Sequence, residues 1–316
     1  MIPANKDEVM NIDPARRTDE VIKAVFQELL GDMQRHEAAL RQQHSAKSLH
    51  QFRIAVRKTR SLLGRCHQAL PANRLSRFRR EFSWLGDFTS GPRDLDVFLN
   101  QVNRLREQSG IESSQLDPFV DYLVMRRDQH HQRLYESLDS VRYTRLVRDW
   151  REFLALPPPR TSTLDYAKRP VKEFADAGIW KCYRRVMKKG KRIKSDSSDG
   201  EVHDLRKACK KLRYMMEFFQ TLYPKKKITT QIKHLKKLQD KLGKFQDICV
   251  QEEILKAFIR PLDHDVWAPV TTRQLMDDLL KEHGKKKKTM HKKIPKVFSA
   301  YAGKNYRKQT KKLFKN

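Results

Sequence analysis

The chain has 316 residues, of which 68 are lysine or arginine and 38 are aspartate or glutamate, giving a formal net charge of +30 at pH 7. This much like charge repels itself unless an anion neutralises it, so we expect an anionic partner. Hydrophobic residues still make up 38% of the chain, enough for a packed core, which excludes general disorder. The sequence contains no run of about 20 apolar residues, which excludes a membrane-spanning helix and indicates no contact with a membrane.

The first residues, MIPANKDEVM, lack the basic and apolar regions of a signal peptide. The cysteines are far apart and form no CxxC pair, as is typical of buried thiols in a reduced compartment. They are Cys66, Cys182, Cys209 and Cys249. We therefore expect a cytoplasmic protein.

Glycine is scarce and long stretches lack proline, whereas leucine, lysine, arginine and glutamine, which favour helices, are plentiful. Alternation of period two is almost absent, so we predict an all-α fold. In the first half, Ser48 with Gln51 three residues later is typical of a capping box at a helix start. Ser198 and Glu201 stand in the same relation in the second half, after the break SDSSDG.

Two long segments of the chain resemble each other. SLHQFRIAVRKTRSLL ends at Leu63 and is matched by EVHDLRKACKKLRYMM, which ends at Met216, an offset of 153 residues (216 − 63). At the same offset, LGDFTSGPRDLDV is matched by LQDKLGKFQDICV. The two segments align without a gap and share identical His, Arg and Asp residues, which predicts a tandem duplication. The identical pairs include His50 with His203, Arg53 with Arg206, Arg60 with Arg213, Asp87 with Asp240, and Asp94 with Asp247.

The join between the two copies contains LALPPPRTST, from Leu154 to Thr163. Proline removes a backbone donor and disfavours helix in the residue before it, so this segment ends a helical stretch. We therefore predict an N-terminal segment at 1–17 and a single domain at 18–316. Within the domain, the first repeat covers 18–156, the linker 157–169 and the second repeat 170–316. We expect about four helices in each repeat, packed as two bundles related by a pseudo-twofold axis.

On a helical wheel, both matched helices separate basic residues from apolar ones. One arc carries His50, Arg53, Arg57 and Arg60 in the first copy, and His203, Arg206, Lys210 and Arg213 in the second, with Tyr214 beside it. Lys58, Lys207 and Lys211 widen the two basic faces. Ordinary solvated faces mix charge signs, because like pairs at i,i+4 destabilise a helix by about 0.2–0.5 kcal/mol. Two acid-free stripes therefore favour an anion bound along both helices.

The spacing of the stripes indicates what kind of anion would fit. A helix presents a side chain on one face about every 5.4 Å, so two facing stripes would offer a cation about every 2.7 Å. A linear phosphate polymer carries a charge on every unit and matches this density. Arginine can hold phosphate oxygens with two parallel hydrogen bonds, while lysine acts as a point charge.

The pattern resembles the conserved histidine α-helical domain family, usually called CHAD. The resemblance depends on two copies of a His-x-x-Arg-x-x-x-(Arg/Lys)-(Arg/Lys)-x-Arg helix, starting at His50 and His203, together with the segments GPRDLDV and LQDKLGKFQD. It covers nearly the whole chain from about residue 18. One departure is the pair Thr89 and Ser90, which replaces the family's Leu-Gly before the Arg-Asp segment.

The resemblance implies two four-helix bundles around a basic central channel that binds inorganic polyphosphate without established catalysis. It also implies the standalone form of the family, association with polyphosphate granules, and no cofactor. Carried over by position, the polyphosphate-binding residues would be His50, Arg53, Arg57, Arg60, His203, Arg206, Lys210, Arg213 and Tyr214. We add Lys58, Lys207 and Lys211 from the widened basic faces.

Two other functions are alternatives. A pI near 10 is typical of nucleic-acid-binding proteins, and such a protein would use the same basic surface. Single-strand binders interleave aromatic residues for base stacking, and the stripes contain only Tyr214, so we expect nucleic acid to be a weaker competitor. An enzyme acting on polyphosphate would need metal-holding acids facing the stripes, and their absence from both arcs predicts neither catalytic residues nor a metal site.

Acidic residues and one further lysine run remain to be placed. Asp94 and Asp247 recur at matching positions, whereas Asp96 is matched by Cys249, so we expect the repeated acids to orient a histidine or arginine, or to cap a helix. The run GKKKKTMHKKIPK, residues 284–296, is either a solvated loop or mobile helix end, or an electrostatic collar for the same ligand.

Overall fold

The structure is a computed structural model that describes residues 10–43, 45–108, 113–262 and 269–315, so most of the predicted N-terminal segment lies outside it. Across these residues the fold is all-α, as predicted, and no strand is formed. The first repeat contains α1 (Thr18–Gln43), α2 (Ala46–Leu63), α3 (Ala72–Phe88), α4 (Ser90–Gln108), α5 (Ser113–Asp139) and α6 (Val141–Ala155). The second contains α7 (Val171–Gly190), α8 (Asp199–Phe218), α9 (Lys225–Leu262), α10 (Val270–Tyr301) and α11 (Lys304–Phe314). None of these helices is both long enough and apolar enough to cross a bilayer.

The helix starts follow the offset seen in the sequence. α1, α2 and α3 begin at Thr18, Ala46 and Ala72, and α7, α8 and α9 begin 153 residues later, at Val171, Asp199 and Lys225 (for example 171 − 18). The long helix α9 covers the positions equivalent to both α3 and α4.

The break between α3 and α4 has a local cause. The hydroxyl of Thr89 donates to the carbonyl of Gly86 at 2.9 Å, which competes with helical hydrogen bonding. Pro92 follows and has no backbone N–H to donate. The equivalent positions in α9 are Leu242 and Phe245, which allow the helix to continue.

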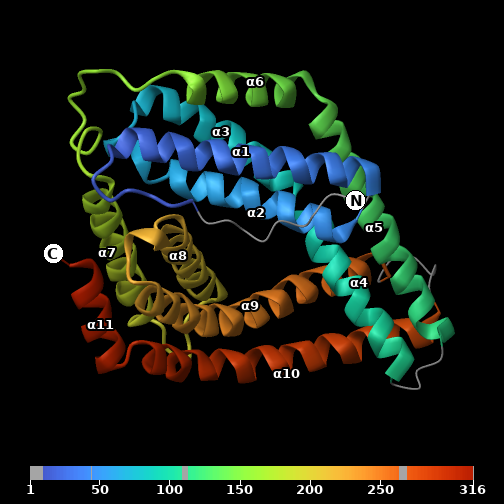
Figure 1. Cartoon of the computed structure of the whole chain (residues 1–316). Coiled ribbons are helices and arrows are strands. Elements are labelled where there is room, and N and C mark those ends of the chain that lie inside the picture. The colour runs from blue at the N-terminus through green and yellow to red at the C-terminus, as the bar shows by residue number, and fades with distance from the viewer. Residues whose placement is uncertain (1–9, 44, 109–112, 263–268, 316) are drawn as a thin grey trace.

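Each repeat contributes one bundle and one arm (Figure 1). The upper bundle in Figure 1 contains α1, α2, α3 and α6, and the lower one contains α7, α8, the first half of α9 and α11 with the end of α10. The arms are the hairpin α4–α5 and the hairpin made by the second half of α9 and the start of α10, and they pack on each other. In the first repeat the arm α4–α5 accounts for the two helices beyond the four expected. In the second repeat α9 and α10 each extend from the bundle into the arm, and α11 is the fifth helix.

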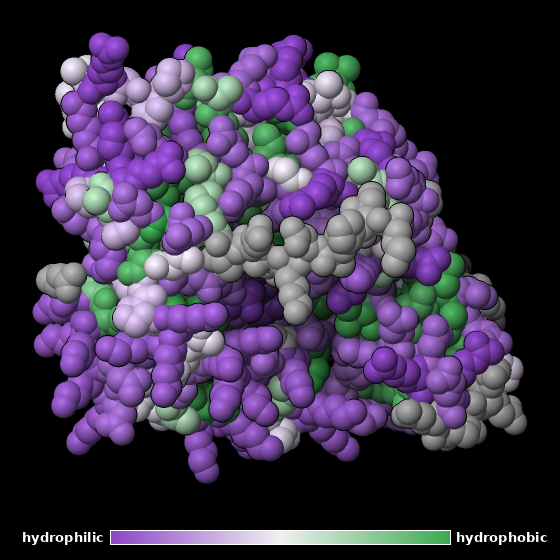
Figure 2. Space-filling view, viewed as in Figure 1, coloured by the Kyte–Doolittle hydropathy of each residue, from purple (hydrophilic) through white to green (hydrophobic). Residues whose placement is uncertain are grey.

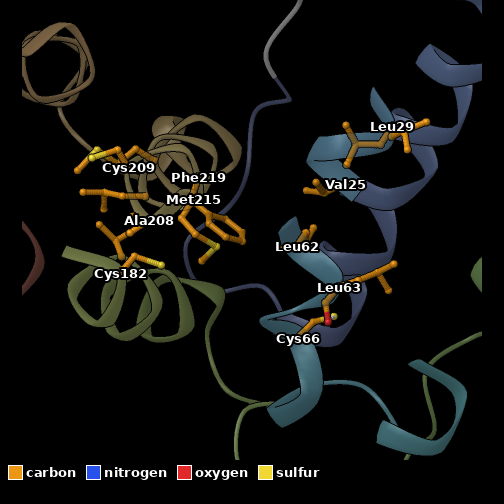
Figure 3. Packing of buried hydrophobic residues seen from close by; sticks show 14 of the residues in the cluster. Val25, Leu29, Leu62, Leu63, Cys66, Cys182, Ala208, Cys209, Met215 and Phe219 are labelled. Carbon is orange, nitrogen blue, oxygen red and sulfur yellow. Dashed lines mark hydrogen bonds between the residues drawn. The ribbon is translucent and has the colours of Figure 1, made fainter. Parts of the chain in front are cut away.

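The hydrophobic core has two parts. The larger part fills both bundles; Figure 3 shows Leu29 and Leu62 on the α1–α2 side and Cys182, Cys209 and Met215 on the α7–α8 side. The smaller part joins the arms through Leu95, Phe98, Phe119, Leu255, Phe258 and Met276. Burying one large apolar side chain stabilises the fold by about 1.5–3 kcal/mol, so these clusters hold the two repeats together.

The repeats also meet through a small two-fold contact at their starts. The amide of Thr18 donates to the carbonyl of Arg169 at 3.0 Å, and the amide of Val171 donates to the carbonyl of Arg16 at 2.8 Å. Thr18 and Val171 occupy equivalent positions, as do Arg16 and Arg169, so each hydrogen bond is the counterpart of the other. This contact lets the N-terminal residues and the linker hold the starts of α1 and α7 together.

The predicted capping box is confirmed in the second repeat and wrong in the first. Ser198 Oγ accepts from the Glu201 amide at 3.3 Å, and the Glu201 carboxylate accepts from the Ser198 amide at 2.9 Å. α2 begins earlier than the predicted box, with Ser45 as its N-cap accepting from the Ser48 amide at 3.1 Å. Ser45 is equivalent to Ser198, but Ser48 stands where the box has Glu201, so the sequence pattern is lost there.

Removing either real cap should destabilise the protein, because an N-cap side chain satisfies a backbone donor that the helix leaves free. We expect Ser198→Ala and Ser45→Ala each to lower the free energy of unfolding by about 1 kcal/mol. Gln51→Ala should change it by less than about 0.5 kcal/mol. Urea denaturation followed by circular dichroism measures all three, and a cost for Gln51→Ala equal to that for Ser45→Ala would contradict this assignment of the caps.

Candidate functional site

The basic faces of α2 and α8 lie at the boundary between the two bundles. α2 buries Phe52 and Val56 in its own bundle, and α8 buries Leu205 and Leu212 in the other. The two helices also contact each other. Figure 2 shows hydrophilic side chains around a hollow between the upper and lower bundles on this face, which we call the central hollow. The charges of Arg53 and Arg57 of α2 act on Arg206 and Lys210 of α8, so basic side chains from both repeats converge where the two helices meet.

Four cations form the centre of this site: Arg53 and Arg57 of α2, and Arg206 and Lys210 of α8. We call them the central basic cluster. Burial, followed by repulsion from the arginines of the cluster and from Arg213, lowers the pKa of Lys210 to about 6. None of the four makes an ion pair with a carboxylate in the described part of the chain. Lys210 is therefore largely uncharged at neutral pH until an anion arrives to favour its protonated form.

Arg53 and Arg206 occupy equivalent positions in the two repeats, and the side chain of each has a buried donor without an acceptor. Burial lowers the pKa of both guanidinium groups; Asp94 opposes the shift at Arg53, and Arg57 adds to it at Arg206. The Nε atom of each is enclosed, without a hydrogen-bond acceptor among the described residues. An enclosed donor without an acceptor costs about 1–3 kcal/mol, so a bound oxyanion would stabilise both positions.

Arg60 lies beyond the cluster, against α3. Its Nη2 atom donates to Ser83 Oγ at 2.9 Å, and burial lowers the pKa of its guanidinium, with Asp87 opposing. The guanidinium also crosses Gly86 so closely that a Cβ at that position would lie 2.2 Å from Nη1. Glycine at residue 86 thus makes room for Arg60.

The equivalent arginine of the second repeat, Arg213, has different partners. Its Nε lies 3.3 Å from Glu217 Oε1, and its guanidinium lies over the ring of Tyr214, 5.3 Å from the ring centroid. Tyr214 itself is only 3% exposed. The structure therefore places Tyr214 in the wall behind the arginines, with little surface for a ligand.

The two histidines at equivalent positions, His50 and His203, also differ in their surroundings. His203 Nδ1 forms a hydrogen bond with Gln246 Oε1. The residue equivalent to Gln246 is Arg93, and the pKa of His50 is lowered by burial and then by the charge of Arg93. Arg93 was not among the predicted ligands, although it lies in the repeated segment GPRDLDV. It extends the cationic surface from α2 onto α4.

Two of the predicted lysines, Lys207 and Lys211, interact with groups outside the central basic cluster. Lys207 pairs with Asp204 at 2.8 Å, which satisfies its charge within α8. Burial and then the charge of Arg65 lower the pKa of Lys211, which is also influenced by groups of α7 rather than by the cluster. Lys58 is half-buried and forms no ion pair with a described residue. The helical wheel placed Lys207 and Lys211 at the edges of the basic arc, where a small rotation of the helix directs a side chain away from the cluster.

The repeated acids lie next to the cluster. Asp94 of α4 and Asp247 of α9 both oppose the lowering of the Arg206 pKa, without a direct ion pair to it. Solvent reaches Asp247, yet the crowded protein atoms around it raise its pKa, with Arg206 opposing. Asp96 points to another partner, His131, at 3.7 Å. Over the described residues no group of three or more His, Cys, Asp or Glu side chains could hold a metal ion.

The lysine run at 284–296 is part of α10, so it is not a loop. Lys287 pairs with Asp199 of α8 and with Glu252 of α9, both at 2.7 Å. Lys286 pairs with Glu282 at 2.6 Å. At least these two lysines hold α10 against its neighbours or stabilise it locally.

The crowding around Lys210 should be visible in the stability of the protein without ligand. Its folded pKa lies below the unfolded value, so its protonated form disfavours folding, and the penalty fades as the pH rises. We expect Lys210→Met to raise the free energy of unfolding at neutral pH by about 1–2 kcal/mol, since solvent screens part of the repulsion. Between about pH 6 and pH 10, the free energy of unfolding should increase less with pH in Lys210→Met than in the unchanged protein.

Urea denaturation in a buffer free of polyvalent anions measures this effect, with the exposed Lys236→Met of α9 as control. A Lys210→Met variant that is no more stable than the control, with the same pH dependence, would contradict the repulsion.

Comparisons with known proteins agree with this architecture. A sequence profile described as "CHAD domain" matches residues 24–256. The crystal structure of the CHAD domain from the plant Ricinus communis superposes with a TM-score of 0.77 at 21% identity, covering 95% of this chain and 96% of that one. PptA from Streptomyces chartreusis superposes with a TM-score of 0.66 at 13% identity, covering 90% and 99%. No curated protein matches the sequence. Since the profile spans well over half of the sequence, the chain belongs to the CHAD domain family.

Proposed function

We propose that this protein binds inorganic polyphosphate in the central hollow and does not catalyse a reaction on it. The observation that carries the proposal is the central basic cluster, in which cations from two repeats converge without a paired carboxylate. A ligand with several closely spaced charges would offset the repulsion and accept from the enclosed Nε atoms of Arg53 and Arg206. Membership in the CHAD family supports the same ligand class.

The shape of the site favours a linear polymer over a single phosphate. The basic residues of each helix recur about every 5.4 Å along its axis, and two such rows from α2 and α8 contribute alternate contacts. Arg60, Arg93 and Arg213 extend the rows beyond the cluster. Successive units of one chain would therefore find cations along the hollow.

Nucleic acid on the same surface is the second candidate. A single strand gains about 1–3 kcal/mol for each base that stacks on an aromatic side chain. Tyr214 is the aromatic residue of the predicted site, and its ring is almost fully enclosed. The affinity of a ligand made of phosphate without bases would not be reduced by the burial of this ring.

We infer a binding role because the acids near the cluster are poorly suited to hold catalytic metal ions. Metal-assisted phosphoryl transfer requires carboxylates that bind cations beside the phosphate. Asp94 and Asp247 already act on Arg206, whose charge would repel a metal ion from the same place. Release of phosphate from polyphosphate by the protein with magnesium or manganese would overturn this inference.

The first test removes the two equivalent arginines together, Arg53→Ala with Arg206→Ala. We expect the affinity for long-chain polyphosphate, measured by calorimetric titration, to fall about 100-fold or more, because each charged hydrogen bond contributes about 1.5–3 kcal/mol. The control, Arg145→Ala with Arg151→Ala, removes two exposed arginines of α6 and should change affinity by less than about threefold.

Single-stranded DNA of matched total charge should not displace the polyphosphate. Displacement by DNA, or equal losses in both double variants, would mean that the cluster is generic positive charge. We also propose that the protein is cytoplasmic and associates with polyphosphate granules, so a fluorescent fusion should co-localise with them and the Arg53/Arg206 variant should not.

Binding should be accompanied by proton uptake at Lys210. Its pKa is about 6 without ligand and should rise beside phosphate, so affinity should decrease as the pH increases from about 6 to about 8. Lys210→Arg keeps the charge at every pH and should retain binding while reducing this dependence. Calorimetry in two buffers with different ionisation enthalpies measures the protons taken up, and an unchanged uptake in Lys210→Arg would refute the role of Lys210.

A further inference from the structure

A second basic groove lies between α7 and α11, which form the left side of Figure 1. It encloses about 870 Å³. Eight of its eleven lining residues are lysine or arginine, and among these described residues none is acidic. We call it the α7–α11 groove. The face of α7 that carries Cys182 packs in the core toward α8, so the groove opens on a different side of α7 from the central hollow.

The cations of the groove form two facing rows. Arg184 and Lys188 of α7, with Lys191 directly after its last residue, form one row, and Lys304, Arg307, Lys308 and Lys311 recur along α11. Spacings of three and four residues place each row on a single side of its helix. None of these side chains makes an ion pair with a described residue. Their charge is therefore available to an anion.

The floor of the groove is aromatic, unlike that of the central hollow. Trp180 is half-buried and stacks on Tyr183, with ring centroids 5.3 Å apart and ring planes inclined by 28°. Met187, which is 8% exposed, completes the floor. Trp180 lies one helical turn before Arg184, so a ligand that combines rings with phosphates could contact an aromatic ring and the cations of the same groove.

The first repeat provides an internal comparison, because α1 is the equivalent of α7. The positions equivalent to Trp180, Arg184, Lys188 and Lys191 are Gln27, Gly31, Arg35 and Ala38. The single cation among these, Arg35, is paired with Asp32. The groove is thus a property of the second repeat alone and does not follow from the duplication or from the fold of the helix pair.

We propose that the α7–α11 groove binds single-stranded nucleic acid, with phosphates along both cationic rows and a base stacked on Trp180. Polyphosphate has no part that would gain from an indole floor. A bilayer would require apolar side chains at the surface, and the exposed large apolar residues of the described chain do not line the groove: Met125, Val141, Leu156 and Val270. The α7 row spans about 10 Å, which corresponds to about three nucleotides.

The test uses the full chain and a fluorescein-labelled oligodeoxynucleotide of mixed sequence, about eight nucleotides long, in anisotropy titrations over a range of salt. The groove variant is Arg184→Gln with Lys188→Gln and Lys308→Gln. Its matched control, Arg145→Gln with Arg151→Gln and Arg160→Gln, removes three exposed arginines in and after α6, so both variants have the same net charge. An abasic oligomer of equal length reports stacking without any change to the protein.

We expect the groove variant to lose about 30-fold or more in affinity and its salt dependence to decrease by about two counterions, against a small change in the control. The abasic oligomer and Trp180→Leu should each bind about tenfold more weakly. Polyphosphate affinity should be kept by the groove variant, and oligonucleotide affinity by the Arg53→Ala, Arg206→Ala protein, so failure of one site can be told from failure of the other.

Three results would overturn the proposal. Equal losses in the groove variant and its control would show that the groove is not the site. If the abasic oligomer bound as tightly as the normal one, base stacking on Trp180 would be refuted. This result would hold even if Trp180→Leu failed to fold, because it uses the unchanged protein. If the groove variant lost as much affinity for polyphosphate as for the oligonucleotide, the groove would be assigned to polyphosphate instead.

Discussion

Repulsion between like charges where α2 meets α8 is the constraint that the rest of the structure accommodates. Arg53, Arg57, Arg206 and Lys210 come together there without a carboxylate in contact. The opposite faces of the same helices are packed into their own bundles, and each large apolar side chain buried there contributes about 1.5–3 kcal/mol. The core can therefore hold the cations at close range, and the polyanion that we propose as ligand would convert the repulsion into binding free energy.

The two basic stripes occupy positions related by the 153-residue offset, and residue differences at these positions make the site asymmetric. Arg57 has a guanidinium group, whereas its counterpart Lys210 has an amine whose pKa is lowered to about 6. Arg93 stands beside His50, whereas Gln246 holds His203 by a hydrogen bond. Equivalent positions of the two repeats thus present different cationic groups and different hydrogen-bond partners.

The two basic surfaces differ in the aromatic residues beside the charge. In the central hollow Tyr214 is enclosed, so the proposed ligand would meet guanidinium and ammonium groups. In the α7–α11 groove, the half-buried Trp180 is one of the lining residues. High net charge attracts polyanions to both, while the apolar floor can discriminate between phosphate chains with and without bases.

The sequence alone determined that the chain is helical, which helix faces are basic, and where the equivalent positions of the two copies lie. These are local properties, because helical periodicity and residue identity at a constant offset need no knowledge of packing. The capping box at Ser198 was readable for the same reason, whereas the cap at Ser45 was not, because its partner at the third helical position is Ser48 and not an acid or amide.

Tertiary structure decided which cations converge. Arg93 reaches the site from α4, Lys207 is paired with Asp204, and Tyr214 is enclosed. The α7–α11 groove joins residues more than a hundred positions apart in the chain. Each of these outcomes depends on how helices rotate and pack against one another, and a wheel drawn for one helix contains no information about its neighbours.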